Sequence, residues 1–252
     1  MFKAILTRFR QGHRTMAYPD APQPVPPRFR GLPRLDASRC GEGCRSCADA
    51  CPYGAISSSG LLTLDMGKCL FCADCAVVCP HDAITFSTDA RLSSRSRAGL
   101  TVTADEEYHP AGELESKLLR LFGRSLKLRE VSAGGCNACE ADTNVLSTIG
   151  WDLGRFGIQF VASPRHADGL FVTGPVSENM REALLATYTA IPEPKLVIVA
   201  GACAINGGPF KDHAEVHNGA DGFIPVDLYI PGCPPSPLTI LDGLLRLVGR
   251  VK

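Results

Sequence analysis

The segment CLFCADCAVVCP at residues 69–80 decides how the N-terminal part of the chain folds. Its four cysteines are separated by two, two and three residues, and a proline follows the last of them. A second segment, CGEGCRSCADACP at residues 40–52, repeats this arrangement with three residues in its first gap, where glycines allow the positive φ that absorbs the extra residue. Between the copies, residues 56–65 predict a hairpin that turns at Ser58, Ser59 and Gly60. Residues 40–87 are therefore an internal repeat.

This spacing is typical of proteins that hold two [4Fe–4S] clusters. Three thiolates on one tight loop reach three irons of one cluster, and the fourth points away to the other cluster. The predicted ligands are Cys51, Cys69, Cys72 and Cys75 for one cluster, and Cys40, Cys44, Cys47 and Cys79 for the other. Zinc fits less well, because eight cysteines in overlapping short spacings leave no clean two-pair arrangement. We predict an α+β, bacterial 2[4Fe–4S] ferredoxin-like domain with a core too small to fold unaided.

The composition also points to metal. The 252 residues include 12 cysteines, and the first 20 residues have neither an apolar core nor a small-residue cleavage site, so we expect no secretory signal. Disulfide frameworks are typical of exported chains, which favours metal binding here. The longest apolar run, residues 196–205, spans about ten residues and is too short for a transmembrane helix. Equal numbers of Lys+Arg and Asp+Glu, 26 each, argue against a nucleic-acid partner.

Residues 1–39 read as an extended, Pro-rich, basic leader. Six prolines between residues 19 and 33 prevent regular helix, and only residues 2–9 predict a short amphipathic helix. Eight Lys/Arg against two Asp/Glu give this leader a net charge of +6. We expect it to lie along a partner or to face membrane headgroups; a solvated basic tail is the alternative.

Residues 113–252 alternate between helical and strand patterns. Residues 88–112 are polar and read as a linker. Strands are expected at residues 126–131, 158–163, 169–174, 195–201 and 226–232, and helices at 113–122, 177–188 and 238–248. This alternation predicts an α/β domain with a doubly wound parallel sheet.

The remaining four cysteines each follow a predicted strand. Because the carboxyl ends of parallel strands share one edge, we expect these cysteines to converge there and hold a third [4Fe–4S] cluster. They are Cys136, Cys139, Cys203 and Cys233. Neighbouring glycines would let backbone N–H groups approach the sulfides. The alternatives are zinc and four buried structural cysteines.

Three motifs carry a family resemblance. GGCNACE (134–140), GACAINGGPF (201–210) and PGCPPSP (231–237), with SPRHAD (163–168) as support, resemble the small, proximal-cluster subunit shared by group 4 [NiFe] hydrogenases and complex I, where it is the 20 kDa subunit. AYPDAPQPVPPRFRG (17–31) and the paired cysteine motifs resemble the two-cluster ferredoxin-like subunit of the same complexes. The resemblance implies a fusion of the two subunits and a flavodoxin-like sheet domain without a flavin site.

Two details favour the hydrogenase side of this family. Two residues separate Cys136 from Cys139, as is typical of hydrogenases, whereas the complex I subunit has adjacent cysteines at this position. Glu140 follows, where hydrogenases often carry an acidic residue for proton transfer; a salt-bridged surface glutamate is the alternative.

The resemblance implies an oxidoreductase subunit with no catalytic metal of its own. It would relay electrons through three [4Fe–4S] clusters to or from the catalytic large subunit of a membrane-associated [NiFe] hydrogenase, of formate hydrogenlyase or energy-converting type. Implied partners are a [NiFe] large-subunit-like or complex I 49 kDa-like protein, membrane-arm subunits and an electron-donor subunit. The implied location is cytoplasmic, peripheral on the inner face of the cell membrane. The alternatives are a complex I-like module, a related complex without nickel, and a free ferredoxin-like carrier.

Overall fold

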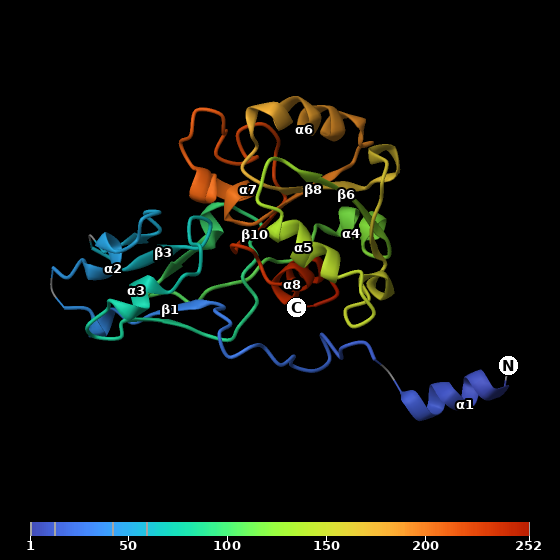
Figure 1. Cartoon of the computed structure of the whole chain (residues 1–252), viewed down its shortest axis with the longest axis horizontal. Helices are drawn as coiled ribbons and strands as arrows, with labels where there is room; N and C mark the ends of the chain where they lie inside the picture. Colours follow the sequence, from blue (N-terminus) through green and yellow to red (C-terminus); the bar gives the residue numbers. More distant parts are fainter. Residues whose placement is uncertain (1, 13, 42, 59, 252) are drawn as a thin grey trace.

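The computed structural model describes residues 2–12, 14–41, 43–58 and 60–251. It shows a larger C-terminal part built around a parallel sheet, a smaller N-terminal part beside it, and a helix that projects away from both (Figure 1). This helix, α1 (Phe2–Gln11), lies where the sequence predicts it. Within the described ranges, no helix is long and apolar enough to cross a membrane.

A five-stranded sheet forms the centre of the C-terminal part. Its strands are β6 (Leu126–Ser132), β7 (Ile158–Phe160), β8 (Gly169–Thr173), β9 (Leu196–Ala200) and β10 (Leu228–Ile230). All pairs are parallel, in the order β10-β9-β8-β6-β7. Numbered along the chain this is the order 2-1-3-4-5, one of the two common orders of doubly wound sheets. The predicted parallel sheet is confirmed.

Helices cover both faces of this sheet (Figure 1). One face packs against α6 (Glu178–Ala190) and α7 (Ala202–Asn206). The other packs against α4 (Ser116–Phe122), α5 (Ala138–Val145) and α8 (Pro237–Leu247). Apolar residues point alternately to the two faces along each strand, so the fully buried strands read as continuous apolar runs in the sequence.

The N-terminal part consists of two small antiparallel sheets and two short helices. β2 (Ile56–Ser57), β3 (Thr63–Asp65) and β5 (Thr101–Thr103) form one sheet, and β1 (Pro33–Leu35) pairs with β4 (Ile84–Phe86) in the other. The hairpin expected at residues 56–65 is therefore present; Ser59 in its turn lies outside the described residues. The helices are α2 (Ser46–Asp49) and α3 (Asp74–Val77), and single 3-10 turns lie at Ala37–Arg39, Ala98–Leu100, Leu153–Phe156, Pro164–His166 and Gly208–Phe210.

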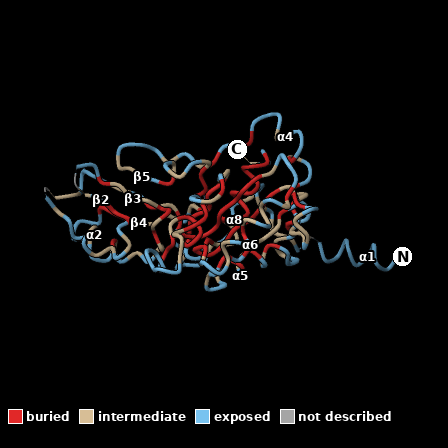
Figure 2. Tube along the Cα trace, turned by 90° about the horizontal axis from the view of Figure 1, so that it is seen from above, coloured by how far each residue is buried: buried red, intermediate tan, exposed pale blue. Residues whose placement is uncertain are grey.

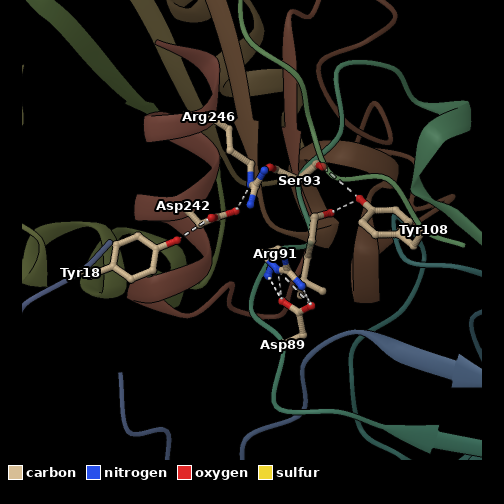
Figure 3. A network of polar contacts seen from close by, with 8 residues as sticks. Tyr18, Asp89, Arg91, Ser93, Tyr108, Asp242 and Arg246 are labelled. Carbon is tan, nitrogen blue, oxygen red and sulfur yellow. Dashed lines mark hydrogen bonds and ion pairs between the residues drawn. The ribbon is translucent and has the colours of Figure 1, made fainter. Parts of the chain in front are cut away.

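The segment 88–112, expected as a linker, is ordered. It contributes β5 to the sheet of β3, and Ser94 exchanges two backbone hydrogen bonds with Tyr229 at the end of the larger sheet. Tyr108 donates to the carbonyl oxygens of Leu92 and Ser93 at 2.7 and 3.0 Å (Figure 3). The polar composition suggested a loop because these backbone partners lie far away in the sequence.

The leader is extended, as expected, but residues 16–32 lie along this chain itself. Met16 N–H donates to the Gly150 carbonyl at 2.9 Å, and the Tyr18 hydroxyl donates to Asp242 of α8 (Figure 3). Met16 and Tyr18 also pack against the α8 side of the core. These residues therefore contact their own chain, and the expected contact of the leader with a partner stays a prediction.

One apolar cluster joins the two parts of the molecule. It includes Leu64, Met66 and Leu100 from the N-terminal part, together with Val199 of β9 and Ile205 of α7. Figure 2 shows buried residues in both parts of the molecule, while α1 is exposed along its whole length. The N-terminal part thus gains much of its burial from the larger part.

Candidate metal centres

The structure brings the four C-terminal cysteines to one edge of the large sheet. Cys136 and Cys139 follow β6, Cys203 lies in α7 directly after β9, and Cys233 follows β10. Burial raises the pKa of the Cys139 thiol, and the charges of Cys203, Glu140, Cys233 and Cys136 raise it further. Burial also raises the pKa of Cys203 to about 12, with Cys233 and Cys136 adding to it. These thiols are near neighbours, and a bound cation would favour their thiolate forms.

Two glycines fit this site closely around sulfur. A Cβ on Gly201, whose φ is +93°, would lie 2.5 Å from Cys139 Sγ, and one on Gly208, whose φ is +53°, would lie 2.9 Å from Cys203 Sγ. Both positions require the left-handed backbone that glycine adopts easily. The absence of these two side chains leaves room around the thiols, as a [4Fe–4S] cluster requires.

Glu140 is buried beside the same edge. It is 6% exposed, and its Oε1 accepts hydrogen bonds from Ser132 Oγ at 2.5 Å and from Thr173 Oγ1 at 2.6 Å. The alternative of a salt-bridged surface glutamate does not describe this side chain. Its hydroxyl partners sit at the ends of β6 and β8, so the sheet itself holds the carboxylate in place.

Glu130, in β6, is a second partly buried carboxyl that the sequence did not single out. Burial raises its pKa to about 7, with the Glu140 charge adding to the shift and Arg129 opposing it. Its Oε1 is buried without a hydrogen-bond partner among the described residues. The available signal was an acidic residue inside the strand predicted at residues 126–131, which is unusual for a strand of a sheet covered on both faces.

In the N-terminal part, the second cysteine motif and Cys51 come together as expected. Burial raises the pKa of Cys69 to about 12; the Phe71 N–H lowers it, and Cys75, Cys51 and Cys72 raise it. The four cysteines line one small cavity. Phe71 N–H points at Cys69 Sγ at 3.3 Å, and Ala55 N–H points at Cys51 Sγ at 3.4 Å. Such N–H groups stabilise sulfur that carries negative charge.

The first cysteine motif forms a similar group with Cys79. Burial raises the pKa of Cys47, and the charges of Cys79 and Cys40 add to this. Cys40 and Cys44 line a common cavity, and Ala83 N–H points at Cys79 Sγ at 3.2 Å. Gly43 has φ of +70°, in agreement with the expectation that a glycine absorbs the extra residue; Glu42 beside it lies outside the described residues.

A single metal ion would need a tighter arrangement than these groups have. Among the residues that the structure describes, no three His, Cys, Asp or Glu side chains lie close enough to hold one ion. When bound, a [4Fe–4S] cluster supplies one-electron redox chemistry, and the cysteine sets named above would be its ligands.

Comparison with known proteins agrees with the geometry. Residues 136–247 match the family described as NADH ubiquinone oxidoreductase, 20 Kd subunit. Over 136 residues the chain is 41% identical to the "Probable membrane-bound hydrogenase subunit mbhJ" of Pyrococcus furiosus, covering 54% of this chain and 81% of that protein. The chain belongs to the 20 kDa subunit family. It is therefore an oxidoreductase subunit, and the resemblance stated from the sequence is confirmed.

Other relatives of this 20 kDa family member include a hydrogenlyase subunit and an NADH-quinone oxidoreductase subunit. "Formate hydrogenlyase subunit 7" of Escherichia coli is 41% identical over 163 residues, which cover 64% of this chain but only 63% of that protein. An NADH-quinone oxidoreductase subunit of Clostridium beijerinckii is 44% identical over 118 residues, covering 46% of this chain and 70% of that protein. Iron–sulfur binding follows from the family and the twelve cysteines.

Two further similarities complete the comparison. Residues 38–87 match the family described as NosR. A chain in the solved structure of a membrane-bound sulfane sulfur reductase, an archaeal respiratory membrane complex, is 34% identical, with a TM-score of 0.47 and coverage of 54% of this chain and 75% of that one.

Proposed function

We propose that this chain is the electron-transfer subunit of a membrane-associated [NiFe] hydrogenase, of formate hydrogenlyase or energy-converting type. It would hold three [4Fe–4S] clusters, two in a ferredoxin-like domain at residues 40–87 and one at the edge of the large sheet. The observation that carries this proposal is the convergence of three strand ends on Cys136, Cys139, Cys203 and Cys233. The relatives among hydrogenase subunits support the same assignment.

The cavities suggest the order of the clusters. Cys233 lines one cavity together with Leu70 and Phe71, and Phe71 also donates its N–H to Cys69. The cluster held by the group containing Cys69 would therefore lie between the other two clusters. The group containing Cys40 lies further out, near α2 at the end of the molecule opposite the large sheet (Figure 1).

The residues of this chain would fix the positions of the clusters and the polarity of their surroundings. Each site has at least one buried cysteine, and backbone N–H groups offset the negative charge on sulfur. Two electrons, passed one at a time, would combine with two protons at the partner's catalytic centre for each hydrogen molecule formed. The reverse reaction would return two electrons and two protons.

Glu140 is proposed as a proton-transfer residue at the sheet edge. Its burial and its two hydroxyl partners hold a carboxylate next to Cys139, where charge changes as electrons pass. A carboxylate in that position can take up or release a proton toward the partner. Thr173 and Ser132 would orient it.

The exposed part of the sheet edge is the proposed contact with the catalytic subunit. Cys136 and Cys233 are exposed, although Cys139 and Cys203 are buried. A large-subunit-like partner would cover the open side, with a donor subunit near Cys40 and membrane-arm subunits completing a complex on the inner face of the cell membrane. A complex I-like quinone oxidoreductase module is the second candidate, favoured by the 44% identity to the NADH-quinone oxidoreductase relative.

The test uses the complex purified anaerobically through a tag on this chain. Three clusters predict about 12 iron atoms and 12 sulfides per chain. Cys203→Ala should leave the two N-terminal signals in the EPR spectrum and abolish electron delivery to the partner. Zinc in place of iron, only eight irons, or wild-type turnover in the mutant would contradict the proposal. Nickel in the co-purified large subunit selects the hydrogenase, and its absence with quinone reduction selects the second candidate.

A further inference from the structure

Helix α1 presents an apolar face that none of the residues described by the structure covers. Phe2, Ile5, Leu6 and Phe9 recur at the spacing of one helix face, and all four are exposed, Phe2 by 74% and Phe9 by 83%. None of the helix's residues is buried, and α1 stands clear of the body in both views (Figures 1 and 2). Four large apolar side chains on one face are a strong driving force for burial elsewhere.

Cations border this face on both sides. At about 3.6 residues per turn, Lys3 and Arg10 lie along one edge of the apolar face and Arg8 along the other. Arg14 follows the helix, and the first acidic residue of the sequence is Asp20. A surface that accepts this helix must therefore be apolar in the middle and negatively charged on both sides.

Residues that follow α1 are hydrogen-bonded to the body of the protein. Met16 N–H donates to the Gly150 carbonyl at 2.9 Å, and an Arg155 Nη donates to the Tyr18 carbonyl at 3.1 Å. The chain is thus fastened a few residues after α1 ends, so the helix would tether the sheet domain close to whatever surface it enters.

We propose that α1 lies in the plane of an anionic lipid bilayer, with its apolar face at the acyl boundary and its cations on lipid phosphates. Ten residues of helix span about 15 Å, half the hydrocarbon thickness, so the helix would lie on the bilayer without crossing it. Long basic side chains at the edge of such a face reach the phosphates while their stems cover apolar surface. Each basic residue near an anionic leaflet adds to binding. This adds a lipid contact to the proposed peripheral location and does not depend on the electron relay.

The experiment measures sedimentation of the full iron-loaded chain with vesicles. The chain should bind vesicles that contain phosphatidylglycerol and bind phosphatidylcholine vesicles much more weakly. Phe2→Ser with Phe9→Ser should lower binding at least about tenfold. Leu6→Ser should lower it severalfold, whereas Leu61→Ser should not change it. Leu6 and Leu61 are a matched pair, with 41% and 42% exposure, and Leu61 lies in the N-terminal part away from α1.

Three outcomes would overturn the proposal. One is equal vesicle binding by the wild type and the double variant, and another is binding that does not respond to anionic lipid. The third is that the wild type does not bind vesicles but forms a dimer or a partner complex, and that the double variant loses this assembly. That result would mean that α1 contacts another protein chain and not lipid. Iron content and EPR signals, measured on the same samples, should be unchanged in every variant, so a failure here is distinguishable from a failure of the electron-transfer proposal.

Discussion

The hydroxyl of Tyr18 donates a hydrogen bond of 2.6 Å to Oδ1 of Asp242, a residue of the closing helix α8. Asp242 is 1% exposed, and its other oxygen accepts from Arg246 Nε at 2.8 Å (Figure 3). Burial raises the pKa of Asp242, while the Tyr18 hydrogen bond and the Arg246 charge lower it. The leader therefore completes the hydrogen bonding of an ion pair in the core of the sheet domain.

Tyr18→Phe should destabilise the sheet domain by about 2 kcal/mol, because the ring stays and a buried carboxylate loses one donor. Urea unfolding of the iron-loaded protein measures this change. Tyr53→Phe is the control, since the Tyr53 hydroxyl has no hydrogen-bond partner among the described residues. Equal unfolding midpoints for the Tyr18 variant and the wild type would show that the leader does not stabilise the domain.

Gly201→Ala should remove the sheet-edge cluster and leave the other two. Its Cβ would lie 2.5 Å from Cys139 Sγ in a backbone conformation with φ of +93°, so the ligand has to move. We expect about four fewer irons per chain and the loss of one EPR signal. Gly222→Ala is the matched control, because a Cβ at Gly222 meets nothing within 4 Å. A full iron complement in the Gly201 variant would mean that this close contact is not needed.

The cysteine sets could be predicted because they depend on local rules. Spacing along a loop assigns Cys69, Cys72 and Cys75 to one group, and strand alternation places Cys203 and Cys233 at one edge. Most cysteines whose charges raise one another's pKa fall into the same groups, although the charge of Cys47 in one N-terminal group also raises the pKa of Cys75 in the other. The ligand assignment itself remains a prediction that metal analysis will test.

The features that sequence reasoning missed depend on distant partners. Residues 101–103 are polar on their own and become β5 only because β3 offers free backbone groups. The hydroxyl of Tyr18 donates a hydrogen bond to Asp242, near the other end of the chain. No local sequence pattern could therefore predict that the leader contacts α8. Glu130 is unusual only when helices cover its strand, which the sequence indicates in outline but not residue by residue.

Glu130 should make stability fall as pH rises. Its pKa is raised from 4.5 to about 7 in the folded protein, so between these values the folded state binds more protons than the unfolded state. The free energy of unfolding therefore decreases across this window, by about 1–2 kcal/mol once solvent screening of this partly exposed group is included.

Glu130→Gln should flatten that slope. Urea unfolding of the iron-loaded protein between about pH 5 and pH 8 measures this slope. The free energy of unfolding of the variant should exceed that of the wild type most at the upper end of this range. Glu182→Gln makes the same charge change on an exposed part of α6 and serves as the control. A wild-type slope that persists in the Glu130 variant would assign the pH dependence to another group.

Arg97 forms a partly buried ion pair with Asp65 inside the N-terminal part of the molecule. Its guanidinium donates to both oxygens of Asp65 at 2.8 and 2.7 Å, and Asp65 Oδ1 also accepts from Gly67 N–H at 2.8 Å. A Cβ on Gly67 would lie 2.7 Å from Arg97 Cζ and 2.9 Å from Ile205 Cγ2. Gly67 thus lies close both to this ion pair and to Ile205 of α7, the helix that carries Cys203.

Arg97→Lys should cost about 1–2 kcal/mol, because lysine keeps the charge but cannot make both hydrogen bonds to a carboxylate with little exposure. Arg39→Lys, in an exposed pair with Asp36, should leave the stability nearly unchanged. Urea unfolding measures both. If this ion pair also helps to fix the position of the middle cluster, flash reduction of the complex should show slower electron transfer to the sheet-edge cluster in the Arg97 variant and an unchanged rate in the Arg39 variant. Equal stability of the two variants would show that the two hydrogen bonds from Arg97 to Asp65 do not stabilise the fold.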